Sequence, residues 1–349
     1  MQTDQGSKLS RIFLVLQNIP NTKVYLRRGV FCYPTSTYLY RNIVAVTLLI
    51  ASVGLAGCTT TARINQFKNF STVGVAYTNA LDPLLNSAGE AAIDANSLIL
   101  EEAFPASQDK DAIARAQELE THNKLLRDRL AILNDIKLHA HLLRTYFQVL
   151  GSLAESDAPE GIGTGATEVV KQLGCISPKI KEAKIGKASV ADFIGPAVKI
   201  AVKNFQRAAL DRELSTRSPF IERELELQSA ALQAITRTMR EDLRVQLNQR
   251  MFKEIFAPYT KDASLPKDWT QKRKVNLTSE LAVAAADAAA NAAKDLKTAF
   301  ISLVEGGFTA ADLPAIINDI NAIFDLVELA KKGSQQPTSQ PTRSTQPAQ

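Results

Sequence analysis

The sequence predicts an all-α protein, an elongated bundle of long antiparallel helices that ends in a disordered tail. After Cys58, apolar residues recur almost everywhere at spacings of three or four, the period of a helix with one buried face. We find no convincing stretch with the period of two that a half-buried strand requires. The apolar fraction, 45% of 349 residues, is sufficient for a sizeable core.

The first two helices are expected to form a long hairpin over residues 63–156. Apolar positions recur from Phe70 to Leu98, and Pro83 inside this pattern predicts either a kink or a break into two helices. The segment Glu101–Asp109 is a turn by composition, and a second periodic run extends from Ile113 to Leu150. Two long helices joined by a short turn pack antiparallel, in the manner of a coiled coil.

Residues 157–190 are expected to be a linker with one short helix. The glycine-rich segment Asp157–Gly165 is a loop by composition, and the short helix lies around Glu168–Leu173. Four lysines follow in a connector, where they are either solvated or in contact with anionic headgroups, and solvation is the preferred interpretation. They are Lys179, Lys181, Lys184 and Lys187.

Residues 191–332 are expected to hold the remaining helices of the bundle. Ser189 and Asp192 have the spacing of a capping box and predict the start of one helix. Ser218-Pro219 predicts a second start, since proline is favoured at the first helical position. From Ile221 to Ile255 a single apolar stripe predicts a half-buried helix.

The last two helices are predicted from their ends. An alanine-rich periodic segment from Leu277 to Leu303 is expected to stop at Gly306-Gly307. Thr309 and Asp312 have the spacing of a capping box for the final helix. Residues 333–349 contain almost nothing apolar and are expected to be disordered.

The charge distribution argues against a nucleic-acid partner. The whole chain has a formal charge of +5. Residues 1–57 carry six basic side chains against Asp4 and account for all of that charge. Residues 58–349 are therefore neutral, and no basic field is expected to attract nucleic acid.

The N-terminal region has the parts of an export signal. Arg41 precedes an apolar run, Ile43–Ala56, whose helical length of about 21 Å is too short for a hydrocarbon core of about 30 Å. The run ends in four residues that resemble the lipobox of bacterial lipoproteins. They are Leu55, Ala56, Gly57 and Cys58.

The resemblance implies cleavage between Gly57 and Cys58 and acylation of Cys58, with residues 58–62 as a lipidated tether. Acyl chains such as palmitate would then be the membrane partner. Thr59 resembles the residue found there in lipoproteins sorted to the outer membrane, so the periplasmic face of that membrane is preferred over the inner membrane.

The long segment before the apolar run has two interpretations. Arg27-Arg28 faintly resembles a twin-arginine export motif, but polar residues separate it from the apolar run. The preferred interpretation is that the first 30 to 38 residues reflect a start assigned too early, with translation beginning nearer Val30 or Leu39.

The sequence contains a histidine pair that could suggest a metal site and glycine-rich segments that could suggest phosphate binding. His139 and His141 are two apart on a helix and point about 200° away from each other, so they cannot share a metal without a third element. The segments Gly161–Gly165 and Gly186–Ser189 resemble phosphate loops but lack the required spacing, which indicates linkers. We therefore expect no metal and no cofactor.

Other reactive side chains also have structural interpretations. Glu222, Glu224 and Glu226 are interpreted as a solvated face at a helix start. Cys175 has no partner within the exported chain and is expected to be a small buried hydrophobe, with an intermolecular disulfide as the alternative.

The expected function is a membrane-anchored periplasmic lipoprotein with a non-enzymatic structural or protein-interaction role and an unidentified protein partner. The alternative is a membrane-active bundle that inserts an apolar hairpin near residues 300–326. An enzyme with an unrecognised site ranks third, since long helices with few aromatics offer surface rather than a pocket.

Overall fold

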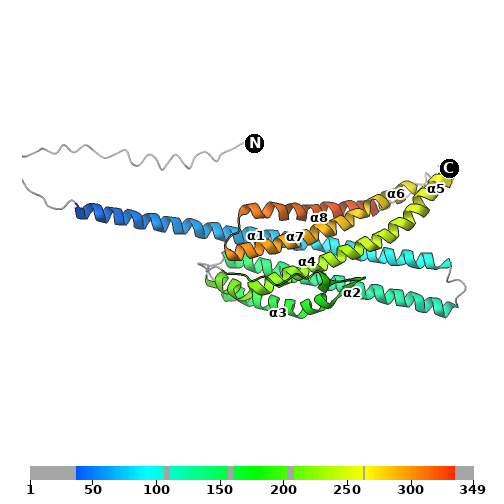
Figure 1. The fold of residues 1–349 in the computed structure, drawn as a ribbon, viewed down its shortest axis with the longest axis horizontal. Coiled ribbons are helices and arrows are strands. Elements are labelled where there is room, and N and C mark those ends of the chain that lie inside the picture. Colours follow the sequence, from blue (N-terminus) through cyan, green and yellow to red (C-terminus); the bar gives the residue numbers. More distant parts are fainter. Residues whose placement is uncertain (1–36, 106–110, 156–159, 203–207, 262–263, 335–349) are drawn as a thin grey trace, which may run out of the picture. The chain divides into compact units, whose positions relative to one another are not determined.

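The computed structural model describes residues 37–105, 111–155, 160–202, 208–261 and 264–334 (Figure 1). The first part of the expected leader and most of the expected disordered tail lie outside these ranges. The chain divides into two compact units, Met1–Ala56 and Gly57–Gln349, and the helical bundle belongs to the second.

The described residues form an α-helical bundle, so the predicted all-α fold of long antiparallel helices is confirmed. Its α-helices are α1 Thr37–Ala103, α2 Ala112–Glu155, α3 Glu160–Glu182, α4 Ala208–Arg250, α5 Ala257–Lys261, α6 Trp269–Thr278, α7 Glu280–Glu305 and α8 Leu313–Ser334. Short elements are the strands β1 Lys184–Ile185 and β2 Ala188–Ser189, the 3₁₀ turns η2 Val190–Phe193 and η4 Ala310–Asp312, and the π-helix η3 Met251–Phe256. Among these helices, none is both long enough and apolar enough to cross a bilayer.

α1 and α2 form an antiparallel pair. Asn86 contacts Lys137 at 3.4 Å, and Asn96 contacts His122 at 3.1 Å. Later residues of α1 therefore contact earlier residues of α2, as in an antiparallel pair. α1 continues through Pro83, which excludes the predicted break. Leu81 and Leu84 beside this proline are wholly buried, and their packing offsets the free energy lost with the helix hydrogen bond that proline cannot make.

One continuous core joins α1, α2 and α3 to α4, α7 and α8, and α7 packs along both α4 and α8 (Figure 1). The alanines of α7 allow this close approach, since small side chains bring helix axes together. An aromatic cluster joins α7 to the hairpin: the ring of Phe70 lies 5.7 Å from Phe147 and 5.8 Å from Phe300.

The predicted loop is wrong from Glu160 onward, with its first three residues outside the described ranges, and the helix expected around Glu168–Leu173 is present but much longer than predicted. α3 already begins at Glu160 and continues to Glu182, so it includes Lys179 and Lys181 of the expected connector. A buried stripe at three-or-four spacing explains its length, because packing outweighs the low helix propensity of glycine. The stripe consists of Ala166, Val169, Leu173, Ile176 and Ile180.

The helix predicted from Ser189 is also wrong. Ser189 ends a two-stranded hairpin and makes no capping bond, and a 3₁₀ turn and an extended segment follow. Gly186 has a φ of 60°, which suits glycine in the turn between the strands. Thr238 of α4 holds the hairpin by donating to the carbonyl of Ile185 at 2.5 Å.

The helix start predicted at Ser218-Pro219 is wrong, whereas the turn predicted at Gly306-Gly307 is confirmed. Ser218-Pro219 lies inside α4, which begins at Ala208, because buried residues upstream extend the same stripe. The turn after α7 is confirmed: Gly306 adopts a left-handed φ of 76°. Thr309 donates its backbone N–H to Asp312 Oδ2 at 2.6 Å, which fits the predicted capping box.

Candidate functional site

The four lipobox residues, Leu55, Ala56, Gly57 and Cys58, fall within the bounds of α1. Their side chains lie outside the described part of the structure. Acylation of Cys58 and cleavage after Gly57 therefore remain predictions from the sequence.

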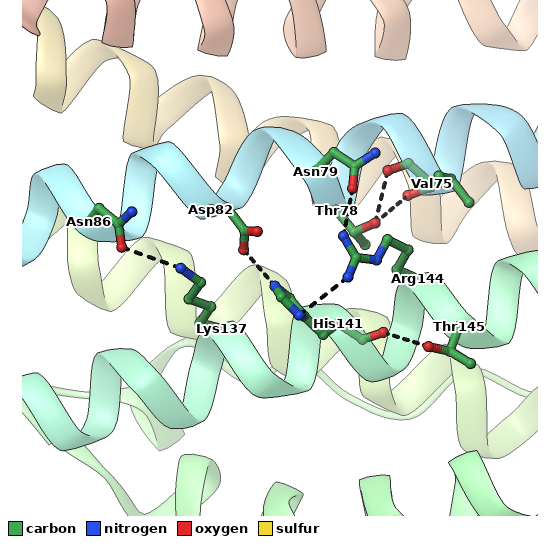
Figure 2. Close-up of polar contacts among 10 residues, drawn as sticks. Val75, Thr78, Asn79, Asp82, Asn86, Lys137, His141, Arg144 and Thr145 are labelled. Atoms are coloured by element: carbon green, nitrogen blue, oxygen red, sulfur yellow. Dashed lines mark hydrogen bonds and ion pairs between the residues drawn. The ribbon is translucent and has the colours of Figure 1, made fainter.

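The surface histidine of the pair lies in the seam between α1 and α2 (Figure 2). His141 Nε2 is 2.7 Å from Asp82 Oδ1, and its Nδ1 is 3.3 Å from Arg144. Arg144 also donates to Asn79 of α1 at 2.8 Å. Both members of the His141–Asp82 contact are about one-third exposed, so the seam is a solvated polar contact between two helices.

The other histidine of the pair is wholly buried. His139 Nδ1 lies 2.6 Å from Gln228 Oε1, and Nε2 lies 2.8 Å from Glu224 Oε2, both on α4. The same carboxylate oxygen accepts from the hydroxyl of Ser177 on α3. The contacts join three helices, and each ring nitrogen faces an oxygen acceptor.

The acids expected on a solvated face lie in the middle of α4, and two of them, Glu222 and Glu224, are buried. Lys297 of α7 lies 2.5 Å from Glu226 and 3.8 Å from Glu222. Glu226 also accepts from the backbone N–H of Gly195 at 2.6 Å. Burial raises the pKa of Glu222, and the nearby ammonium of Lys297 opposes that rise.

Two further carboxylates of α4 follow the same pattern. Glu213 pairs with Arg217, and Asp242 pairs with Arg129 of α2. Burial raises the pKa of both carboxyls, while the guanidinium beside each opposes the rise. We call Glu213, Glu222, Glu224, Glu226 and Asp242 the α4 acid row.

The α4 acid row is not arranged for nucleophilic catalysis. The hydroxyl of Ser177 donates to the carboxylate of Glu224 and not to the imidazole of His139, so these three residues do not form the Ser–His contact of a catalytic triad. His139 is wholly buried, and a substrate cannot reach it. Across the described ranges, no three His, Cys, Asp or Glu side chains are placed to hold a metal ion.

A cavity of about 560 Å³ lies between α1, α4, α6, α7 and α8. Apolar residues of α4 and α6 contribute to its wall together with Glu90 and Asp94 of α1, Arg250 of α4 and Lys331 of α8. The sequence could not indicate this cavity because its wall combines segments that are far apart in the chain. Its apolar lining includes Met239, Leu243, Val275, Ala282 and Val283.

Cys175 is exposed and free rather than buried as predicted. It lies on α3 between Leu173 and Ile176, which define the buried face of that helix. Its own position in the helical period falls outside that stripe.

Comparisons with protein-family models, with curated proteins and with solved structures found no match to this chain.

Proposed function

We propose that the chain is a lipid-anchored cell-envelope protein whose helical bundle has a non-enzymatic structural or interaction role. The observation that supports this role most is the α4 acid row. Three of its interhelical contacts, at His139, Lys297 and Arg129, use buried or half-buried groups to join α4 to α2 and α7. The acid row is thus used for contacts between helices of the bundle.

The proposed anchor rests on the lipobox resemblance. Acylation at Cys58 would hold the bundle at a membrane surface, and several acyl chains give durable attachment where one is marginal. Thr59 favours the periplasmic face of the outer membrane.

Burial argues against the membrane-active alternative. Phe300, Leu303, Phe308, Ile316 and Ile323, all in the segment that would insert, are at most 3% exposed in the core. Insertion would require these side chains to leave contacts that already remove them from water.

Metabolic labelling with radioactive palmitate tests the anchor. We expect label on the wild-type chain and none on Cys58→Ser, because the thiol of Cys58 is the proposed acceptor. Cys175→Ser is the matched control, since Cys175 is exposed and should leave the label unchanged. Equal labelling of wild type and Cys58→Ser would refute the lipoprotein proposal.

A further inference from the structure

Large exposed apolar side chains gather in two stretches of the bundle. Eleven of the sixteen that the described residues contain lie within residues 90–131 or 250–280. We call residues 90–105 with 111–131 the hairpin end, and residues 250–261 with 264–280 the aromatic end. Such concentrations indicate interaction surfaces, whereas single exposed apolar residues do not.

The hairpin end is the distal part of the α1–α2 pair. Ala92 and Ala95 are its only buried residues among those described, because the core helices cover the pair only further along. Its six large apolar residues are between 42% and 71% exposed. They are Ile93, Ile99, Phe104, Ile113, Leu119 and Leu125.

The aromatic end presents a preformed groove. Phe252, Phe256 and Tyr259 follow one another at spacings of four and three, and all are more than half exposed. The first two line a groove of about 400 Å³ together with Leu277. The π-helix η3 supplies Phe252 and Phe256, and α5 supplies Tyr259; π-turns occur often at functional sites.

Trp269 fixes the geometry of the aromatic end. Its indole N–H donates to the carbonyl of Ile255 at 3.1 Å, and its ring stacks on Tyr259 at 5.8 Å. Arg273 lies over the same ring at 5.7 Å. The surface is therefore held in place before any partner arrives, which lowers the entropic cost of binding.

The two ends carry opposite charge in an otherwise neutral segment of chain. The hairpin end contains eight acids and four bases, and its residues 90–103 contain four acids and no lysine or arginine. The aromatic end contains seven bases and three acids. The groove itself is mainly apolar, and exposed lysines such as Lys253 and Lys261 lie in the same stretch of chain. An acidic apolar helix is the partner that this combination fits.

We propose that the hairpin end of one copy docks into the aromatic end of a second copy. Glu90 and Asp94 at the base of the hairpin end line the same cavity as Arg250 and Val275 of the aromatic end, so both surfaces extend from one place in the bundle. A two-fold pair can engage both surfaces at once and closes as a dimer.

An anionic lipid surface is the competing occupant of the aromatic end, because lysines beside exposed aromatics also suit headgroups. The acids of the hairpin end would be repelled by such a surface. A lipid partner would also leave the apolar residues of the hairpin end in water. A second copy accounts for both ends.

The test uses the full chain carrying Cys58→Ser, which removes the acyl chains as a cause of association. Sedimentation of the detergent-solubilised protein should show a dimer that dissociates as salt rises, because salt screens the opposed charges. Trp269 is the only tryptophan in the chain, so its fluorescence reports on the aromatic end alone. Its quenching by acrylamide should fall on dimerisation.

Charge reversal identifies the partner. Lys253→Glu with Lys261→Glu should raise the dimer Kd at least about tenfold, and so should Asp94→Lys with Glu101→Lys. All four changes together should restore the dimer. Lys179→Glu with Lys181→Glu, on exposed α3 positions, is the matched control and should leave the Kd unchanged. Circular dichroism of each variant checks that the helices persist.

Three results would overturn the inference: a monomer at all concentrations, no recovery in the fourfold variant, or a Trp269 emission shift on phosphatidylglycerol vesicles in monomeric protein. The last would assign the aromatic end to lipid. This inference deepens the proposed interaction role but does not depend on acylation. Loss of the anchor proposal in the palmitate experiment and loss of the dimer are therefore separate outcomes.

Discussion

His139 Nε2 lies 2.8 Å from Glu224 Oε2 in a part of the bundle that water does not reach. The contact joins α2 to α4, and Ser177 adds α3 through the same carboxylate. Two residues further along α2, His141 makes a similar 2.7 Å contact with Asp82, but in solvent. The two histidines therefore form a natural comparison between a buried and an exposed contact of one chemical type.

We expect His139→Ala to destabilise the fold by about 3–5 kcal/mol, because it leaves the carboxylate of Glu224 buried without its main partner. His141→Ala is the matched control and should cost about 1 kcal/mol or less, as exposed ion pairs do. Urea unfolding of both variants measures the difference. Similar losses in the two would contradict the distinction between the buried contact and the seam.

Glu222 should give the stability of the fold a measurable pH dependence. Because burial raises its pKa above the ordinary 4.5, the folded state binds a proton in the window between that value and the raised one. The stability contributed by this carboxyl therefore rises as pH falls through the window, and it is lost as pH rises again.

We expect Glu222→Gln to remove this dependence and to raise stability at pH 7 by up to about 1 kcal/mol. Glu226→Gln should have the opposite sign, about 1–3 kcal/mol destabilising, since Glu226 binds Lys297 at 2.5 Å and Gly195 at 2.6 Å. Unfolding curves of both variants between pH 4 and pH 8 measure the difference. If both substitutions changed the free energy of unfolding in the same direction at pH 7, the different roles given to Glu222 and Glu226 would be wrong.

The elements that the sequence predicted well are those with local causes. The stop at Gly306 needs a left-handed backbone, and the start at Thr309 needs a carboxylate three residues on. Both requirements can be read within a few residues. The α1–α2 pair could likewise be predicted because each helix shows its own apolar period.

The features that sequence reasoning missed depend on distant partners. Glu222 looks solvated until Lys297, more than seventy residues away, is known to lie against it. Ser218-Pro219 has the local pattern of a helix start, yet packing on both sides continues α4 through it. The sequence drew attention to His139 only through its spacing from His141. The residues around the pair did not indicate which of the two imidazole rings would be buried.

Gly74 should tolerate no side chain. A Cβ there would lie 2.7 Å from two ring carbons of Phe147, and that ring is held edge-on against Phe70. We expect Gly74→Ala to cost about 1–3 kcal/mol through overpacking. Gly174→Ala is the control. A Cβ at this position would meet no atom within 4 Å, so alanine should raise the free energy of unfolding by about 0.5–1 kcal/mol. Thermal unfolding of both variants checks the contrast, which would fail if Gly74→Ala were neutral.

The unacylated protein should not release dye from liposomes at neutral pH. Most of the large apolar residues on both sides of Gly306-Gly307, Phe300, Leu303, Phe308, Ile316 and Ile323 among them, are already buried in the core, although Ile317 and Phe324 are exposed. Moving the buried side chains into a bilayer would therefore gain little burial of apolar surface. Insertion would also carry Glu305, Asp312 and neighbouring acids into hydrocarbon, at about 2.5–3.5 kcal/mol each near its centre. The large apolar residues regain only about 0.3–0.6 kcal/mol each on the same scale.

A dye-release assay on vesicles with and without anionic lipid measures this directly, and the expected trace is flat in both. Gly307→Asp adds a further charge at the turn, and a Cβ there meets only Ser302 at ordinary contact distance, so the fold should accept it. Release by the wild-type chain that Gly307→Asp abolishes would show that α7 and α8 leave the core. The membrane-active role would then replace the interaction role, because the same residues cannot be core and membrane anchor at once.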